Sequence, residues 1–472
     1  MSGRRVVIIG GGLAGITAAL DCAAAGAHVT LVEVRRRLGG AAYSVRREGL
    51  EMDNGQHVFL RGCLAYRGLL QRLGSEHLVS VQPRLQIPVL KPGCEPYMLR
   101  RSSLPAPLHL AGALARYPYL SPRQRLGAAR TALALRRIDR REREADRITL
   151  GQWLARHGQG PDAVAALWDL IALPTLNLPA AEASLALGVF VFRRGLLTSA
   201  DEGDIGFHVG TLGDIIGRPA EIALRGAGVE LALGRRAERV RQTATGFEVH
   251  DGGGDGLSAE AVIVAVPHTR AATLLEPLLG GPQAAWRRLG ASPIVNLHVV
   301  YDRTVCEHPF AAGVGTPVQY LFDRSGAAGA PAGCQYLAVS LSGAEREMKL
   351  SVDALRERFL PALEELLPRA RGARVESFLV TREHAATFRA APGVGALRPG
   401  PLTSVPGLLL AGTWTDTGWP ATLESAVLSG HAAARGALRQ LGIEETLPRP
   451  RALTTPARAA TAAARPAGAP AP

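Results

Sequence analysis

Three glycines near the start of the chain have the spacing of a phosphate-binding turn. Gly10, Gly12 and Gly15 form a G-x-G-x-x-G pattern directly after an apolar run. Glycine permits the tight turn and lets the backbone approach a pyrophosphate, whose negative charge is attracted by free amides at a helix start. Glu33 comes 18 residues after Gly15, near the spacing of a carboxylate that binds a ribose hydroxyl. These residues predict a dinucleotide site, and the acid disfavours NADP there.

The elements around this turn are those that position such a site. Val6–Ile9 predicts a buried strand, residues 16–25 predict a helix rich in alanine, and His28–Glu33 predicts a second strand. Further strands are expected at 228–233, 237–240, 260–266, 295–301, 336–341, 375–381 and 408–410, and helices at 212–225 and 352–367. The sequence therefore predicts an α/β fold with a Rossmann-like nucleotide-binding domain.

A second signature of small residues lies about 400 positions further on. The apolar run Leu408–Leu410 is followed by Ala411 and Gly412, and a helix is expected to start at Ala421. Amide groups at that helix start could stabilise negative charge on a reduced flavin. One long cofactor held by both ends of the chain would explain the two signatures.

Together these motifs resemble the flavin amine oxidase and phytoene desaturase superfamily, and within it the squalene-associated desaturase and hydroxysqualene dehydroxylase family. The resemblance runs from residue 4 to about 440. It rests on Glu33 with Gly39-Gly40, and on the segments 53–57, 383–388, 398–399 and 411–430. The chain departs from the family pattern at Ala41, where arginine is common, and at Thr413, Leu423 and Ser425.

The resemblance implies FAD as the cofactor and a Rossmann-like FAD-binding domain of the amine-oxidase type with an inserted mixed α+β substrate domain. We expect the FAD-binding domain at 1–60, 205–282 and 397–442, the substrate domain at 61–204 and 283–396, and a disordered tail at 443–472. The predicted cofactor contacts are Gly10, Gly12, Leu13, Ala14, Gly15, Glu33, Arg35, Gly39, Gly40, Ala41, Gly55, Gln56, Ala237, Gly412, Asp416, Ala421, Thr422 and Leu423.

The family activity implied is the reductive dehydroxylation of hydroxysqualene to squalene, in hopanoid biosynthesis. An acid must protonate the leaving hydroxyl, and reduced flavin N5 then delivers hydride to the allylic cation. Asp53 and His57 are the predicted catalytic residues, with His208 and Glu424 as further candidates, because burial keeps a carboxyl protonated. None of the motifs identifies the electron donor.

Three alternatives remain open. A carotenoid or phytoene-type desaturase would share almost all of these motifs and take hydride from its substrate. A flavin amine oxidase is less well supported, because the only lysines are Lys91 and Lys349, outside the flavin motifs. A non-catalytic escort protein that binds prenylated partners is disfavoured by the intact glycines.

Charge and cysteine content limit the partners and the compartment. The net charge is +13, and residues 123–147 hold nine arginines against four acids, after a helix start at Ser121-Pro122. This segment is either a solvated face or a peripheral contact with anionic lipid; no reader motif for nucleic acid accompanies it. The five cysteines have no metal-ligand spacing, so no metal is expected, and they fit a reducing cytoplasm.

Overall fold

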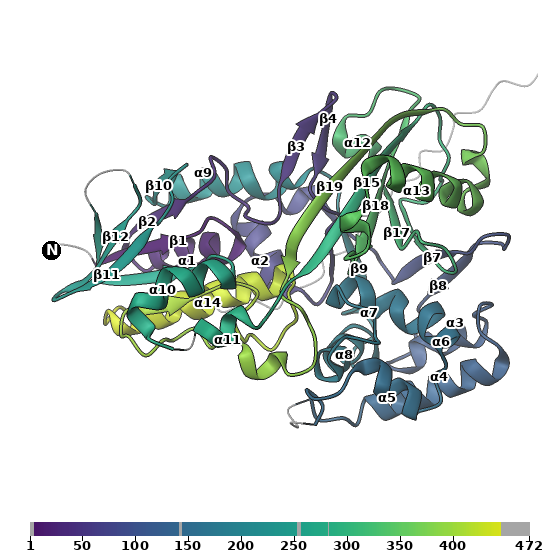
Figure 1. Ribbon diagram of the computed structural model, residues 1–472, viewed down its shortest axis with the longest axis horizontal. Helices are drawn as coiled ribbons and strands as arrows, with labels where there is room; N and C mark the ends of the chain where they lie inside the picture. The colour runs from purple at the N-terminus through teal and green to yellow at the C-terminus, as the bar shows by residue number, and fades with distance from the viewer. Residues whose placement is uncertain (1–3, 141–143, 253–255, 282, 445–472) are drawn as a thin grey trace, which may run out of the picture.

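A computed structural model describes residues 4–140, 144–252, 256–281 and 283–444. A five-stranded sheet lies at the N-terminal end of the molecule (Figure 1). Its order is β10-β2-β1-β14-β20, and every neighbouring pair is parallel. The strands are β1 (Arg5–Ile9), β2 (His28–Glu33), β10 (Glu230–Leu233), β14 (Ala261–Val264) and β20 (Leu408–Leu410). Segments about 400 positions apart in the sequence therefore belong to one parallel sheet, which confirms the predicted Rossmann-like arrangement.

Two helices from opposite ends of the chain pack together beside this sheet. They are α1 (Leu13–Ala24) and α14 (Leu423–Gln440). A Cβ atom at Gly430 of α14 would lie 2.4 Å from the carbonyl oxygen of Ala14, so only glycine allows this close approach. The same sheet is flanked by α9 (Arg218–Gly226), α10 (His268–Leu279), α11 (Gln283–Arg287) and the small antiparallel sheet β11 (Arg239–Thr243), β12 (Gly246–His250) and β13 (Leu257–Ala259).

The second large sheet of the molecule has seven strands. Its order is β19-β15-β18-β17-β16-β7-β8, and only β16 and β7 pair in parallel. The strands are β7 (Gln86–Leu90), β8 (Tyr97–Arg100), β15 (Ser292–Tyr301), β16 (Phe310–Gly313), β17 (Tyr320–Asp323), β18 (Gln335–Ser342) and β19 (Val375–Thr387). Helix α13 (Val352–Leu366) covers it through a shared apolar core. The predicted strands are confirmed, although β19 continues beyond residue 381 because it stays paired with β15 up to Thr387.

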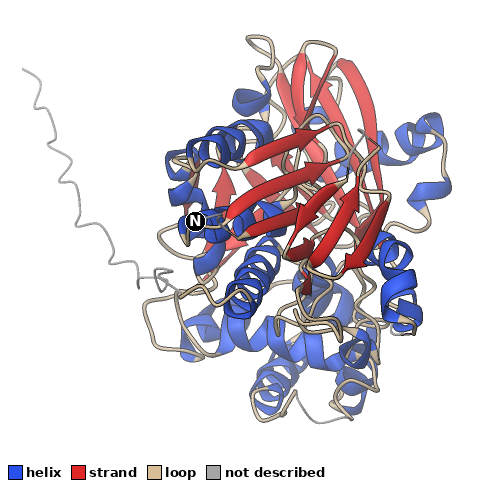
Figure 2. Cartoon of the chain, turned by 90° about the vertical axis from the view of Figure 1, so that its left-hand side faces the viewer, coloured by secondary structure: helices blue, strands red, loops and turns tan. Residues whose placement is uncertain are grey.

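The helices between residues 111 and 192 gather below the seven-stranded sheet, and in Figure 2 the strands occupy the centre and upper part of the molecule. They are α3 (Ala111–Ala115), α4 (Pro122–Leu135), α5 (Leu150–Arg156), α6 (Pro161–Ala163), α7 (Asp169–Leu176) and α8 (Leu185–Phe192). Trp168, Leu185 and Val189 are buried in their common core. No helix of the described residues has the length and apolar character needed to cross a bilayer.

Short elements connect the two halves. They are the hairpin β3 (Ser44–Arg47) and β4 (Leu50–Asp53), the sheet of β5 (Val58–Leu60), β9 (Ile205–His208) and β6 (Val79–Val81), and the helices α2 (Leu64–Arg72) and α12 (Ser325–Ala328). The division into an FAD-binding and a substrate domain at the expected boundaries stays a prediction. Of the tail expected at 443–472, the part from residue 445 onward lies outside the described residues.

Candidate functional site

In the glycine turn between β1 and α1, two glycines are required by close backbone contacts and the third is not. A Cβ at Gly10 would lie 2.5 Å from the carbonyl oxygen of Ala265, and one at Gly15 would lie 1.8 Å from the carbonyl oxygen of Gly10. These two glycines therefore make the turn possible. At Gly12 the backbone is extended, and the nearest atom to a built Cβ is Gly40 Cα at 3.7 Å. Gly12 instead leaves space open in front of the first amides of α1, where a pyrophosphate is favoured.

The second glycine pair lies directly against this turn. Gly39 has φ +104°, forms a bridge with Gly12 and donates its amide to the Gly11 carbonyl at 2.9 Å. Glu33 is buried, and its carboxylate accepts the Gly11 amide at 2.7 Å. The structure thus brings together the glycines and the acid that the sequence predicts at 10–15, 33 and 39–40, in one cradle.

Two arginines that follow Glu33, Arg35 and Arg37, differ in what their side chains contact. Arg35 has an exposed side chain, and its amide donates to Glu33. Arg37 donates to the Gly40 carbonyl at 3.3 Å, and its guanidinium lies 3.6 Å from the centre of the Tyr43 ring. Arg37 is therefore the arginine that contacts the double glycine, while Arg35 remains a predicted contact.

The C-terminal signature lies at the next strand ends of the same sheet. The Ala411 amide continues the pairing with β14 by donating to Val264, and the Gly412 amide donates to Ser429 Oγ at 2.8 Å. Thr422 is the N-cap of α14, since its hydroxyl accepts the Ser425 amide at 3.1 Å. The helix thus begins at Leu423, two residues after the expected start at Ala421, because the Thr422 hydroxyl replaces the missing helical acceptor.

Two predicted cofactor contacts have protein partners of their own. The Ala237 carbonyl accepts a hydrogen bond from Arg270 at 2.7 Å. Asp416 is exposed and accepts the Gly418 amide at 3.0 Å. With Arg398, Asp416 lines a cavity of about 730 Å³ whose described lining includes none of the cradle glycines. Their roles toward FAD stay predictions.

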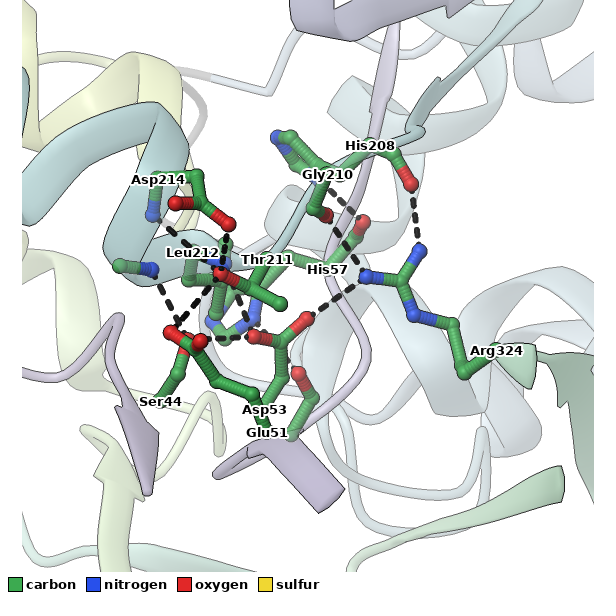
Figure 3. A network of polar contacts seen from close by, with 12 residues as sticks. Ser44, Glu51, Asp53, His57, His208, Gly210, Thr211, Leu212, Asp214 and Arg324 are labelled. Carbon is green, nitrogen blue, oxygen red and sulfur yellow. Dashed lines mark hydrogen bonds and ion pairs between the residues drawn. The ribbon is translucent and has the colours of Figure 1, made fainter. Parts of the chain in front are cut away.

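Asp53 is an ion-pair partner in a buried network (Figure 3). Its Oδ2 lies 2.9 Å from Arg324 Nη2, and the Arg324 side chain is only 11% exposed. Its Oδ1 accepts the Ser44 hydroxyl at 2.7 Å and the Leu212 amide at 2.8 Å. Arg324 also donates to the carbonyls of His208 and Gly210. Asp53 thus joins three segments of the chain, and its role as a catalytic residue stays a prediction.

A hydrogen bond to the backbone fixes the tautomer of His57. Its Nδ1 lies 3.1 Å from the Gly55 carbonyl, which can only accept, so Nδ1 carries the proton and Nε2 has a lone pair. Burial lowers the pKa of His57 below its ordinary value. The His57 carbonyl accepts from His208 Nδ1 at 2.7 Å, and Tyr66 donates to His208 Nε2 at 2.7 Å. His208 is therefore a neutral side chain that holds the backbone of His57 through this hydrogen bond.

A second chain of hydrogen bonds ends on the carbonyl of Asn54. Thr381 donates to this carbonyl at 3.0 Å and accepts from His298 Nε2 at 3.0 Å, so Tyr336 must donate to His298 Nδ1 at 2.6 Å. Asn296 Nδ2 donates to the same carbonyl at 2.9 Å. Two strands of the seven-stranded sheet, β15 and β19, thus fix the backbone that leads into Gly55 and Gln56.

Further polar contacts join this segment to the double glycine. The Asn54 side chain donates to the Ala41 carbonyl at 2.9 Å and to Glu383 Oε1 at 3.0 Å. Tyr43 donates to the same Glu383 oxygen at 2.9 Å. Gln56 Nε2 is buried without a partner among the described residues. Segment 53–57 and the residues after Gly40 are therefore one rigid unit.

The Glu424 carboxylate binds backbone amides of a neighbouring helix. Its two carboxylate oxygens accept the amides of Ala65 at 3.0 Å and Tyr66 at 2.8 Å, at the N-terminus of α2. Burial raises the pKa of Glu424. A carboxylate in this place satisfies two amides that lack helical partners, so Glu424 caps α2 from the distant helix α14.

Acidification is expected to destabilise the protein through His208 and His298. Burial lowers the pKa of His208 to about 3 and that of His298 to about 4. The unfolded chain therefore binds more protons below pH 6.5, and each histidine lowers the free energy of unfolding by about 1.4 kcal/mol per pH unit from there down to its folded pKa. Urea unfolding at pH 7.5 and 5.5 measures this. His298→Gln should reduce the difference, exposed His384→Gln should not, and equal differences in both variants would contradict the neutral His298.

The residues of the cradle fit FAD. The open space at Gly12, the amides of α1 and the acid Glu33 suit a diphosphate and a ribose, and the Ala411–Leu423 segment lies at the neighbouring strand ends. The sequence did not single out Arg324, Asn296, His298 or Tyr43 as partners of segment 53–57. Nothing local marks Arg324, which lies 271 positions from Asp53.

Comparisons with known proteins agree with this cofactor. Residues 13–438 match the family described as flavin containing amine oxidoreductase. A hydroxysqualene dehydroxylase of Rhodopseudomonas palustris is 30% identical over 447 residues, covering 91% of this chain and 97% of that protein. A probable zeta-carotene desaturase of Synechococcus elongatus is 23% identical, covering 93% of this chain and 99% of that protein.

A solved structure has the same fold. The cyclohexylamine oxidase of Brevibacterium oxydans superimposes with a TM-score of 0.72, covering 93% of this chain and 100% of that protein, at 18% identity. At this identity the likeness concerns the fold, whereas the choice among reactions depends on the site and on the closer relatives.

Proposed function

Because the chain belongs to the flavin-containing amine oxidoreductase family and is an FAD-dependent oxidoreductase, we propose that it reductively dehydroxylates hydroxysqualene to squalene. The observation that carries the proposal is the 30% identity to a hydroxysqualene dehydroxylase over nearly the whole of both chains. Two contacts support it: Asn54 joins the segment that carries His57 to the residue after the double glycine, and the Gly55 carbonyl fixes His57 so that Nε2 keeps its lone pair.

The proposed reaction replaces a hydroxyl group by hydrogen. It consumes one hydride and one proton and releases water. FAD, when bound in its reduced form, supplies the hydride. The protein must bring the proton to the hydroxyl and exclude other water from the cation that forms.

We assign the proton to His57. Its Nδ1 is fixed on the Gly55 carbonyl, so a proton taken up at Nε2 is the one it can transfer. Burial lowers the pKa of His57, which makes the protonated ring a stronger acid than free imidazole. Asp53 then supports the segment through its ion pair with Arg324.

An anaerobic single turnover tests the reaction. Enzyme reduced with dithionite and mixed with hydroxysqualene should yield squalene, one molecule per reduced FAD, measured by gas chromatography with mass detection. Dithionite and free FAD without protein are the control, because a chemical reduction would appear there too. Squalene at only the control level would contradict the proposal.

The second candidate is a carotenoid-type desaturase, favoured by the similarity to the Synechococcus elongatus protein. Such an enzyme would take hydride from a polyene with its flavin oxidised. The same experiment separates the two, because oxidised enzyme incubated with phytoene would then produce a conjugated product with new ultraviolet absorption. An amine oxidase is less well supported, because Lys91 lies beside the Tyr119 ring and Lys349 in a surface turn after β18.

An oily substrate also bears on where the protein works. A C30 hydrocarbon partitions into a bilayer instead of water. We place the protein in the cytoplasm, at the inner face of the membrane, and the five free cysteines fit that reducing compartment.

A further inference from the structure

One stretch of the chain combines a strong positive charge with a complete lack of acids. Residues 96–138 contain eight arginines and neither aspartate nor glutamate. They form β8, α3 and α4, which lie together at the lower right of Figure 1. Contacts tie these elements into one lobe: Tyr97 donates to the Ala113 carbonyl at 2.7 Å, and Arg125 donates to the Ala115 carbonyl at 2.8 Å.

Helix α4 exposes a regular face on this lobe. Ser121 caps it in a capping box with Gln124, so its first turn is well fixed. Ala128 and Leu135 are buried in the core formed with α5 and α8, and Thr131 donates to the His157 carbonyl at 3.3 Å. The opposite face carries residues spaced three and four apart, which line up on a helix. This arginine–leucine face consists of Arg123, Leu126, Arg130 and Leu133, together with Arg137 in the turn that directly follows the helix.

The leucines of this face are unusually accessible. Leu126 is 54% exposed and Leu133 is 50% exposed. Two more leucines of the same lobe, Leu104 and Leu108, are 51% and 56% exposed. Single exposed apolar residues are ordinary, but Leu126 and Leu133 lie two helical turns apart on one face, and two more leucines are exposed in the same lobe, which indicates a surface that binds a partner.

The arginines indicate what covers it. Arg123, Arg130 and Arg137 are exposed and form no ion pair with any residue of the described ranges. Guanidinium groups bind phosphate oxygens in pairs of hydrogen bonds, while their stems lie along apolar surface. A surface of alternating cations and leucines matches the boundary between phosphate headgroups and acyl chains.

We propose that the arginine–leucine face of α4 docks on a bilayer of anionic lipids. The leucines insert between the acyl chains and the arginines bind the headgroup phosphates. The inference does not depend on the proposed reaction, because it concerns binding without substrate. It supplies a route by which an apolar substrate would reach the protein.

Vesicle co-sedimentation with the full-length holoenzyme tests the surface. We expect binding to vesicles of phosphatidylcholine with 30% phosphatidylglycerol (about a third anionic lipid, in the range where basic clusters respond), and weak binding to phosphatidylcholine alone. Arg123→Gln/Arg130→Gln/Arg137→Gln should lower the partition coefficient about tenfold or more, and added salt should have a similar effect. Leu126→Ser/Leu133→Ser should lower it about tenfold at any salt concentration.

Matched variants elsewhere on the surface are the controls. Ile222→Ser/Leu402→Ser changes two residues that are 73% and 57% exposed on other elements, and Arg288→Gln/Arg371→Gln removes two exposed arginines outside the lobe. All variants should keep bound FAD and the same thermal unfolding midpoint. Absence of binding to the anionic vesicles, or equal losses in the lobe and control variants, would overturn the proposal. Retention of a protein or nucleic acid by the lobe without any vesicle binding would also overturn it.

Discussion

A Gly12→Val variant is expected to fold normally and to purify without its yellow colour. The Gly12 backbone has φ −78° and ψ 177°, which any residue adopts, and a built Cβ meets only Gly40 Cα at 3.7 Å. The valine side chain would therefore fill the space in front of α1 without breaking the turn. Loss of two charge-assisted hydrogen bonds to the diphosphate corresponds to on the order of 3 kcal/mol, or about 100-fold weaker FAD binding. Absorbance at 450 nm and titration of apoprotein with FAD measure this.

Two other glycines make the interpretation specific. Gly160 is also a helix N-cap, with φ −73° and ψ 167°, and a Cβ there meets nothing within 4 Å. Gly160→Val should therefore keep full FAD content. Gly15→Val should fail differently, because its Cβ would overlap the Gly10 carbonyl and damage the fold itself. Full flavin content in folded Gly12→Val would rule out the cradle as the diphosphate site.

The parts of this fold that could be predicted from sequence are those fixed by local patterns. The apolar runs Val6–Ile9 and Leu408–Leu410 are short and fully buried, as parallel strands covered on both faces must be. Gly10 has φ +113°, which glycine adopts readily, and Gly15 is constrained by the Gly10 carbonyl within the same turn. Local patterns therefore predicted the sheet, and they predicted glycines that the structure brings together at its strand ends.

The partners of the polar side chains could not be predicted in this way. Asp53 has the residue type and position of a catalytic acid, but its ion-pair partner Arg324 lies 271 positions away in the sequence. Glu424 was one candidate acid, and its partners at the start of α2 are about 360 positions away. No repeat or spacing records such contacts, because they arise only when the two sheets are assembled around the same segment.

Asp53→Asn is expected to destabilise the protein by about 3 kcal/mol, because it leaves the buried Arg324 guanidinium without its counter-charge. Arg324→Met should have a similar effect by leaving the carboxylate unpaired. Urea unfolding of the FAD-bound protein at pH 7.5 measures both. The exposed pair of Glu221 and Arg225 is the control: Glu221→Gln should change the free energy of unfolding by less than about 0.5 kcal/mol.

The double variant Asp53→Leu/Arg324→Leu tests whether Asp53 stabilises the fold through its ion pair or serves as the proton donor. If Asp53 serves as an ion-pair anchor, removing both charges should be less destabilising than removing one, because no buried charge is left unpaired. If Asp53 is instead the proton donor, Asp53→Asn should unfold like the native protein and lose its turnover number at unchanged KM. Native stability together with a lost turnover number would therefore assign the acid role to Asp53, whereas lost stability with turnover retained in the folded fraction excludes Asp53 as the proton donor.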